Sequence, residues 1–274
     1  MTAGKMARIL IIAGSDSGGG AGIQADIKTV TMLGGHAMTA ITALTAQNTL
    51  GVDGVMPVPP DFVMQQIDSV SRDIGVDAVK IGMLGGAEIA SRIFDWLTTL
   101  SPDVPVVFDP VMVATSGARL IDDATLQMFD RLMSRATIVT PNVPELMALT
   151  NADIVSSYTL ERAARQLSRQ YRCAVLAKGG HLPGNKLSDL LIDRNGAAHR
   201  WEGDKIDTPH NHGTGCTLAS GVATGIAQGM SMADATERAR FFVREALLHA
   251  PGLGRGHGPM GHGLVRMSDF SLTE

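Results

Sequence analysis

Short apolar runs alternate with amphipathic segments along most of the chain. The apolar runs predict strands at residues 8–13, in part of 37–46, and at 77–81, 104–108, 137–140 and 173–177. The segments between them carry apolar residues at helical spacing, which predicts helices at residues 23–33, 61–72, 88–100, 122–133 and 159–171. This alternation favours an α/β fold with a mostly parallel central sheet and helices on both faces.

The C-terminal part of the chain has a different pattern. Residues 189–192 and 198–201 flank Asn195-Gly196, which predicts a small antiparallel hairpin at the edge of the sheet. A run of small apolar residues at 218–227 is compatible with a buried helix, and Ser231 with Asp234 forms a capping box that predicts another helix. We see no repeat, low-complexity tract or linker, so we predict one domain over residues 1–274.

Composition narrows the class of protein. Hydrophobic residues make up 45% of the 274 positions and aromatic residues only 4%, so the core must consist mainly of aliphatic side chains. The net charge of -4 gives no basic field for nucleic acid or an acidic membrane. The two cysteines, Cys173 and Cys216, lie far apart, and no apolar run reaches membrane-spanning length. We therefore expect a cytoplasmic protein without a disulfide framework or a membrane partner.

The segment HGTGCT, at residues 212–217, precedes the run of small apolar residues. Its two glycines leave several backbone N–H groups uncovered at an expected helix start, which is an anion site. A helix start also stabilises a thiolate, so the position of Cys216 predicts a lowered pKa for its thiol. The segment favours phosphoryl chemistry. The alternative is a glycine-rich turn before a buried helix, with Cys216 as a small hydrophobic residue.

Other polar residues follow the predicted strands. They are Asp16 after the first strand, and Asp109, Asn142 and Lys178 after later ones. In an open α/β sheet, ligands bind at the carboxyl ends of the strands. Each residue alone fits ordinary turn chemistry, but their number at strand ends favours a binding site.

Four other kinds of site were considered. The glycine pattern at residues 20–25 resembles a dinucleotide fingerprint, but it begins well beyond the strand, and residues 27–52 contain no acid for the ribose. The P-loop motif is absent. A metal site at His210, His212 and Cys216 lacks an obvious fourth ligand. A Cys-His hydrolase is conceivable, but a lysine and a glycine-rich anion site fit phosphate better than acyl transfer.

Seven segments of the chain, taken together and in order, resemble one family. They are GSDSGGGAGIQADIKT (14–29), TALTAQNTLGV (42–52), KIGML (80–84), FDPVMVATSG (108–117), TPNVPE (140–145), KGGH (178–181) and HGTGCT (212–217). The family is that of the hydroxymethylpyrimidine/phosphomethylpyrimidine kinases of thiamine biosynthesis, which belong to the ribokinase-like superfamily. The resemblance covers about residues 8–262.

This resemblance implies a fold and an activity. The fold is the ribokinase-like three-layer sandwich. The activity is ATP-dependent phosphorylation of 4-amino-5-hydroxymethyl-2-methylpyrimidine to the monophosphate, and then to the diphosphate. It also implies Mg²⁺ as cofactor and a homodimer in the cytoplasm. Pyridoxal kinase is the alternative, since some relatives with the same cysteine phosphorylate pyridoxal. A non-catalytic pyrimidine-binding module is a further alternative, which intact Lys178, Asn142, Glu145 and Cys216 disfavour.

The resemblance also implies roles for individual residues. Gln47 matches the position that reads the pyrimidine, and its amide offers both a donor and an acceptor. The remaining residues expected to line the substrate pocket are Gly14, Asp26, Met83 and Val111. At Thr115 some relatives carry lysine, which leaves a nucleotide contact there open.

The phosphate machinery is assigned in the same way. Asn142 and Glu145 match a motif that orders Mg²⁺ and the nucleotide phosphates, directly or through water, and Asp109 is expected to join them. The anion hole is expected at Gly213, Thr214 and Gly215.

Lys178 and Cys216 are the expected catalytic residues. Lys178 offsets the charge of the transferring phosphate. Cys216 takes the place of the aspartate base of sugar kinases and accepts the proton of the hydroxymethyl group. The second step needs no strong base, because its nucleophile is an anionic phosphate.

Overall fold

A nine-stranded sheet forms the centre of the computed structural model, which describes residues 6–113, 117 and 120–270. The strands are β1 (Arg8–Asp16), β2 (His36–Gln47), β3 (Val52–Pro57), β4 (Ala78–Ile81), β5 (Val106–Phe108), β6 (Ile138–Val139), β7 (Ala174–Ala177), β8 (Lys186–Ile192) and β9 (Ala198–Asp204). Their order is β3-β2-β1-β4-β5-β6-β7-β8-β9. Neighbours from β2 to β7 are parallel, whereas β3, β8 and β9 pair antiparallel at the two edges.

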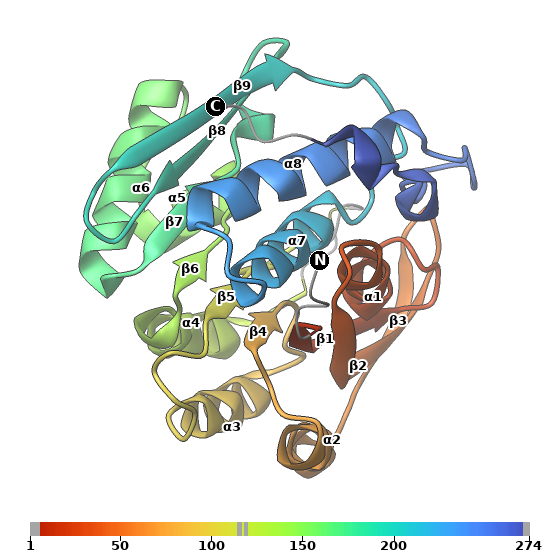
Figure 1. Ribbon diagram of the computed structural model, residues 1–274, viewed down its shortest axis with the longest axis vertical. Helices are drawn as coiled ribbons and strands as arrows, with labels where there is room; N and C mark the ends of the chain where they lie inside the picture. The colour runs from red at the N-terminus through yellow and green to blue at the C-terminus, as the bar shows by residue number, and fades with distance from the viewer. Residues whose placement is uncertain (1–5, 114–116, 118–119, 271–274) are drawn as a thin grey trace.

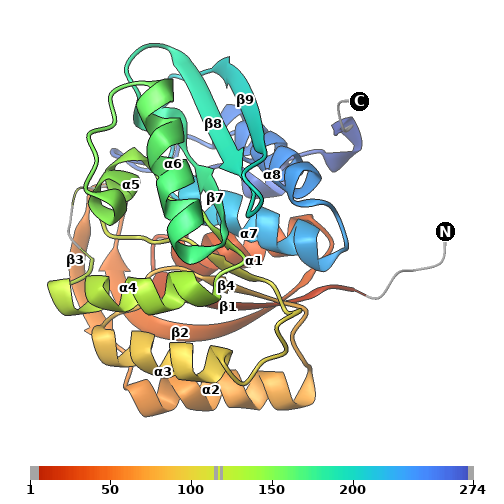
Figure 2. The same cartoon turned by 90° about the vertical axis from the view of Figure 1, so that its left-hand side faces the viewer.

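Helices cover both faces of the sheet. They are α1 (Gly22–Met32), α2 (Pro60–Asp73), α3 (Ala87–Leu97), α4 (Asp123–Arg135), α5 (Val143–Thr150), α6 (Ser157–Tyr171), α7 (Thr214–Ala227) and α8 (Met232–Leu248). One hydrophobic cluster joins the sheet to α2–α6, and a second joins its other face to α1, α7 and α8 (Figures 1 and 2). The expected three-layer sandwich is confirmed.

The alternation along β1 explains how the sheet is buried on both faces. Ile9 and Ile11 belong to the cluster on the α7 side, and Leu10 and Ile12 to the cluster on the α2 side. Successive side chains of a strand point to opposite faces, so a strand between two helical layers is apolar at every position. This is the pattern that predicted the strand.

Small residues let α7 lie close to α8 in the outer layer. A Cβ atom added to Gly221 would lie 2.7 Å from the Cβ atom of Ala239, and one added to Gly225 would lie 2.6 Å from that of Ala235. The small apolar run of α7 therefore serves close helix packing as well as burial.

The sequence predictions missed one strand and one α-helix. β3 is an antiparallel edge strand with mostly exposed residues, so it lacks the apolar run that marked the buried strands. α5 is short, and its first turn overlaps the motif at residues 140–145, for which the sequence predicted only ligand binding. β1 also continues to Asp16, beyond the predicted strand end at residue 13. The predicted hairpin is confirmed as β8 and β9, with both strands longer than expected.

The parallel strands bring one set of chain segments to the same edge of the sheet. From β1 the chain crosses to β2 through α1 on one face, and from β4 it crosses to β5 through α3 on the other. Such a reversal leaves a crevice at the carboxyl ends of the strands. In the part of the chain that the structure describes, no helix has the length and apolar character to span a membrane.

Candidate active site

A cavity of about 660 Å³ opens at the carboxyl ends of the parallel strands. This volume suits a small-molecule ligand. Of the residues predicted for the site, all but Asp26 line the cavity: Gly14, Gln47, Met83, Asp109, Val111, Asn142, Glu145, Lys178, Gly213, Thr214, Gly215 and Cys216. Residues that are far apart in sequence thus meet in one place.

Lys178 is the charged centre of one end of the cavity. Its Nζ atom lies 2.9 Å from Oδ1 of Asp109 and 3.8 Å from Oε2 of Glu145. Burial alone would lower the pKa of Lys178, but the charges of Asp109 and Glu145 outweigh this effect and raise it. The lysine is therefore a permanent cation beside two carboxyl groups.

Asp109 is ionised although it is buried. Burial alone would raise the pKa of its carboxyl, but the charges of Lys178 and Lys80, with hydrogen bonds, hold it below its ordinary value. The hydroxyl of Thr140 donates one of these bonds to Oδ1, at 2.8 Å. A fixed Asp109–Lys178 ion pair thus lies at the carboxyl ends of the strands.

Asn142 and Glu145 are joined at the start of α5. The Asn142 side chain accepts a hydrogen bond from the backbone N–H of Glu145 at 2.9 Å, and Glu145 accepts one from the backbone N–H of Asn142 at 2.8 Å. This is a capping box, which fixes both side chains at the helix N-terminus. Burial raises the pKa of Glu145 to about 7, against the opposing charge of Lys178.

α7 begins inside the cavity, at the HGTGCT segment. Gly213 precedes the helix with a φ of 86°, and a Cβ atom there would lie 2.0 Å from the carbonyl oxygen of Gly20. Only glycine fits this left-handed, crowded position. The first turn of the helix has free N–H groups, and Lys178 lies beside this turn, since a Cβ atom on Gly215 would lie 3.1 Å from Nζ of Lys178.

The expected pKa of Cys216 is wrong. Burial raises the pKa of this thiol to about 11; the charge of Lys80 opposes the increase, and those of Asp26 and Asp109 add to it. The helix start would favour a thiolate, but two nearby carboxylates and the loss of water outweigh it. Without ligands, Cys216 is a neutral thiol at pH 7.

The expected position of Asp26 is also wrong. Asp26 is fully buried and does not line the cavity, and both of its carboxylate oxygens lie within 3.0 Å of Nζ of Lys80. The hydroxyl of Ser220 donates to it at 2.7 Å. A charge on the inner face of α1 needs such partners, so Asp26 joins α1, β4 and α7 and does not touch the cavity. Sequence reasoning missed Lys80, although a lysine within a buried strand signals a buried acidic partner.

Gln47, at the end of β2, also lines the cavity. Gly14 and Met83 line it as well, and a Cβ atom on Gly14 would approach Cε of Met83 to 2.6 Å. Gly14 therefore leaves room for the methionine side chain at the cavity wall. The predicted grouping of Gln47, Gly14, Met83 and Val111 in one cavity agrees with their positions.

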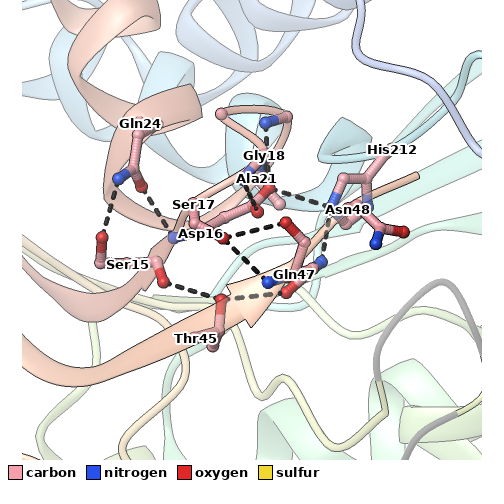
Figure 3. A network of polar contacts seen from close by, with 12 residues as sticks. Ser15, Asp16, Ser17, Gly18, Ala21, Gln24, Thr45, Gln47, Asn48 and His212 are labelled. Atoms are coloured by element: carbon pink, nitrogen blue, oxygen red, sulfur yellow. Dashed lines mark hydrogen bonds and ion pairs between the residues drawn. The ribbon is translucent and has the colours of Figure 1, made fainter. Parts of the chain in front are cut away.

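Asp16 organises the loop between β1 and α1. Its carboxylate accepts backbone hydrogen bonds from Gly18, Gly20 and Ala21, at 2.8 to 2.9 Å (Figure 3). Three amides of the glycine-rich loop thus bind a side chain of the same protein. This occupancy explains physically why the loop is not a dinucleotide phosphate site.

His212 connects this loop to Gln47. Its Nε2 atom lies 3.1 Å from Oδ2 of Asp16 and 2.9 Å from Nε2 of Gln47 (Figure 3). The sequence suggested a metal ligand at His212 and gave no sign of this contact. Among the residues that the structure describes, no group of three His, Cys, Asp or Glu side chains is arranged to hold a metal ion. Thr115 lies outside the described residues, so its nucleotide contact stays open.

Comparisons with known proteins agree with this arrangement. The family model for phosphomethylpyrimidine kinase matches residues 16–261. The hydroxymethylpyrimidine/phosphomethylpyrimidine kinase of Bacillus subtilis (strain 168) is 45% identical over 271 residues, covering 97% of this chain and 98% of that protein. A thiamine biosynthesis bifunctional protein of Geobacter sulfurreducens is 49% identical over 255 residues. The match covers 93% of this chain but only 52% of that longer protein.

A solved structure extends the comparison to the fold. The pyridoxal kinase from Staphylococcus aureus, in complex with AMP-PCP and pyridoxal, superposes with a TM-score of 0.85 at 34% sequence identity. The superposition covers 95% of this chain and 94% of that one. The family model and the full-length relative decide the matter: the chain belongs to the phosphomethylpyrimidine kinase family.

Proposed function

We propose that this chain phosphorylates 4-amino-5-hydroxymethyl-2-methylpyrimidine with ATP, and then phosphorylates the resulting monophosphate. The observation that carries the proposal is the position of Lys178. Its ammonium group faces the first turn of α7 in the same cavity that holds Gln47. A phosphate cradle and an amide that can read a heteroaromatic ring thus share one site.

Phosphoryl transfer needs electrostatic stabilisation and positioning more than covalent chemistry. The N–H groups of Gly213, Thr214 and Gly215 offer donors at a helix N-terminus, and Lys178 supplies a point charge beside them. The Asp109–Lys178 ion pair holds the ammonium group in place before ATP arrives. The nucleotide analogue bound by the pyridoxal kinase relative supports ATP as the phosphate donor.

Mg²⁺ fits the donors at this end of the cavity. Glu145 and Asn142 offer carboxylate and amide oxygens, the hard ligands that Mg²⁺ prefers. They would hold the ion together with the phosphates of ATP, directly or through water, and the ion would supply charge neutralisation there. The capping box keeps both side chains at the mouth of α5, so little rearrangement is needed.

Cys216 accepts the proton of the hydroxymethyl group in the first step. Because its thiol has a pKa of about 11, the thiolate is rare at neutral pH but is a strong base when it forms. The second step does not need this group, because a phosphate oxygen is already ionised. The two steps should therefore differ in their dependence on Cys216.

A comparison of separate acceptors tests the proposed substrate. Purified protein is given ATP and Mg²⁺ with the hydroxymethylpyrimidine, with pyridoxal, or with neither, and ADP release is measured. We expect the pyrimidine to give the larger kcat/KM. Pyridoxal phosphorylation is the second candidate activity, which the structural likeness to a pyridoxal kinase favours. ADP release that no acceptor stimulates would count against both activities.

We also propose a homodimer of one-domain subunits in the cytoplasm. The antiparallel edge of β2 and β3 exposes Leu44, Val55 and Met56, each at 40% or more. Apolar side chains gathered on an edge favour a protein contact. The free thiols of Cys173 and Cys216 support a reducing compartment. Light scattering on the purified protein tests the dimer, and Val55→Lys with Met56→Lys should give monomers.

A further inference from the structure

We propose that His212, held by Asp16, is a positioning residue that sets the orientation of the Gln47 side-chain amide. This orientation decides whether the NH₂ group or the oxygen of the amide lies beside His212. It therefore also decides which of the two groups faces a ring nitrogen of the bound ligand. The inference rests on the proposed function, since it assumes that Gln47 reads the pyrimidine.

The two contacts of His212 make opposite demands on one atom. Nε2 lies 2.9 Å from the amide nitrogen of Gln47 and 3.1 Å from a carboxylate oxygen of Asp16. It can accept a hydrogen bond from the amide nitrogen only if it carries no hydrogen. It can donate to the carboxylate only if it carries one. The two contacts therefore cannot both be hydrogen bonds at the same time.

Asp16 determines whether Nε2 of His212 carries a hydrogen. Its carboxylate accepts hydrogen bonds from the backbone N–H groups of Gly18, Gly20 and Ala21. Burial would raise the pKa of Asp16, but the bond with His212 and the backbone bonds hold it below the ordinary value. An ionised carboxylate only accepts hydrogen bonds. The hydrogen between Asp16 and His212 therefore belongs to Nε2 of the histidine.

An N–H group on His212 repels the amide NH₂ of Gln47 and attracts the amide oxygen. A rotation of 180° about the Cγ–Cδ bond of Gln47 exchanges the two ends of the amide and brings the oxygen to His212. The amide oxygen then shares the Nε2 hydrogen with Asp16. Two acceptors around one donor satisfy all three side chains.

Thr45 gives independent support from the other side of the amide. Its hydroxyl oxygen lies 3.0 Å from the carbonyl oxygen of Ser15 and 3.3 Å from the amide oxygen of Gln47. A hydroxyl has one hydrogen, and the carbonyl of Ser15 can only accept it. Thr45 is then an acceptor toward Gln47, and the same rotation places the amide NH₂ beside it. Both neighbours favour one orientation.

The histidine ring is fixed well enough to impose this orientation. His212 is buried, and its ring lies so close to Gly20 that a Cβ atom there would approach Cδ2 to 2.6 Å. Its backbone N–H donates to the carbonyl of Gly258 at 3.2 Å. The ring is therefore packed against Gly20, and the backbone that carries it is anchored, while it contacts Asp16 and Gln47.

A fixed amide selects the chemistry of the ring edge. The NH₂ group of Gln47 donates to a ring nitrogen, and the amide oxygen has a second lone pair for an amino group. The matching ligand is a heteroaromatic ring with an amino group next to a ring nitrogen. The opposite amide orientation would place donor against donor, so His212 contributes to the preference for an aminopyrimidine.

The protonation of His212 can be measured in the ligand-free wild-type protein. Long-range ¹H–¹⁵N spectra of the imidazole rings at pH 7.5 distinguish a nitrogen that carries hydrogen from one that does not. The signal of His212 is assigned by its loss in His212→Gln, or by its shift in Gln47→Met if that variant does not fold. We expect hydrogen on Nε2. An unprotonated Nε2 would overturn the inference.

A double-mutant cycle tests whether His212 acts through Gln47. Pyrimidine and ATP affinities are measured by calorimetry for His212→Ala, Gln47→Ala and the double variant. We expect His212→Ala to weaken pyrimidine binding about 3- to 10-fold, the worth of one hydrogen bond, with ATP affinity unchanged. In the Gln47→Ala background it should have no further effect, and His212→Gln should restore part of the loss because it keeps an N–H donor.

Additive losses in this cycle would overturn the inference, since they would mean that His212 and Gln47 act independently. Failure of the proposed function gives a different result. In that case the wild-type protein would not bind the pyrimidine, while the spectrum of ligand-free His212 would still show hydrogen on Nε2.

Discussion

Nζ of Lys178 lies 2.9 Å from Oδ1 of Asp109, and the two residues come from loops that follow different strands of the sheet. The backbone pairing helps to bring Lys178 to Asp109. The N–H of Lys178 donates to the carbonyl of Pro141 at 2.9 Å, which continues the parallel pairing of β6 and β7 beyond the two strands. The ion pair is thus a product of sheet topology. It places a cation at the N-terminus of α7, where the proposed function puts a phosphate.

Removal of this cation should slow both phosphorylation steps. Each step develops negative charge on a transferring phosphoryl group, and Lys178→Ala leaves that charge without its closest cation. We expect each kcat to fall by roughly 10²- to 10³-fold. Glu145→Ala should also reduce both steps, through Mg²⁺ and the nucleotide. Steady-state rates with the pyrimidine and with its monophosphate test this. A variant that kept one step at full rate would show that the residue is misplaced in this account.

Gln47→Ala should weaken pyrimidine binding selectively. The substitution leaves polar groups of the buried ring without partners, which costs about 1–3 kcal/mol. The proposed function places ATP beside Lys178 and not beside Gln47, so its affinity should change little. Calorimetric titration with each ligand separates the effects. Equal losses for the two ligands would contradict the assignment of Gln47 to the ring.

The raised pKa of Cys216 predicts a pH dependence for the first step only. The proposed base is the thiolate, whose population rises about tenfold per pH unit below a pKa of about 11. The rate of hydroxymethyl phosphorylation should therefore increase from pH 7 to pH 10. In Cys216→Ala this increase should disappear, and the first step should fall by roughly 10²- to 10⁴-fold.

Cys216→Asp is the matched variant, because it puts a carboxylate base at the same place. It should recover part of the first step and lose the steep rise with pH, while its charge repels the phosphorylated substrate of the second step. The monophosphate provides the internal control in all three proteins. Equal losses in both steps for Cys216→Ala would mean that the thiol positions phosphate and transfers no proton.

His262 predicts a loss of stability in mild acid. Its Nε2 atom lies 2.8 Å from the hydroxyl of Thr217 on α7, and burial with the charge of Lys28 lowers its pKa to about 4. The unfolded chain takes up a proton near pH 6.5, whereas the folded protein does not. The stabilisation is therefore complete above pH 6.5 and falls as the pH drops toward 4, by up to about 3 kcal/mol.

Urea unfolding at pH 7.5 and pH 5 measures this loss. His262→Gln keeps a polar side chain but cannot titrate, so its free energy of unfolding should change less between the two pH values. An equal change in the wild-type protein and the variant would place the acid sensitivity elsewhere.

Local patterns were enough to predict most of the sheet and the polar residues at its strand ends, whereas the family resemblance supplied the roles of the other site residues. β1 was predictable because both of its faces are buried, so every position from Ile9 to Ile12 is apolar. The meeting of Asp109, Asn142 and Lys178 followed from their places after parallel strands. The exposed edge strand β3 left no such pattern.

The two errors have a common physical cause. The partner of Asp26 is Lys80, which is distant in sequence, so nothing near Asp26 indicates that its charge is buried and paired. The local sequence of Cys216 shows a helix start, but its pKa depends on burial and on carboxylates from α1 and the loop after β5. Electrostatic properties that arise from tertiary packing cannot be predicted from the local sequence.

The central claim is that both phosphorylation steps take place in one cavity. The first step phosphorylates the hydroxymethyl group of the pyrimidine, and the second phosphorylates the resulting monophosphate. A ³¹P NMR time course with the hydroxymethylpyrimidine, ATP and Mg²⁺ tests it most directly, with Lys178→Ala as the control. We predict a monophosphate signal that appears first and then gives way to the two coupled signals of a diphosphate, both lost in the control. ATP hydrolysis without either pyrimidine product, or turnover of pyridoxal alone, would contradict the account.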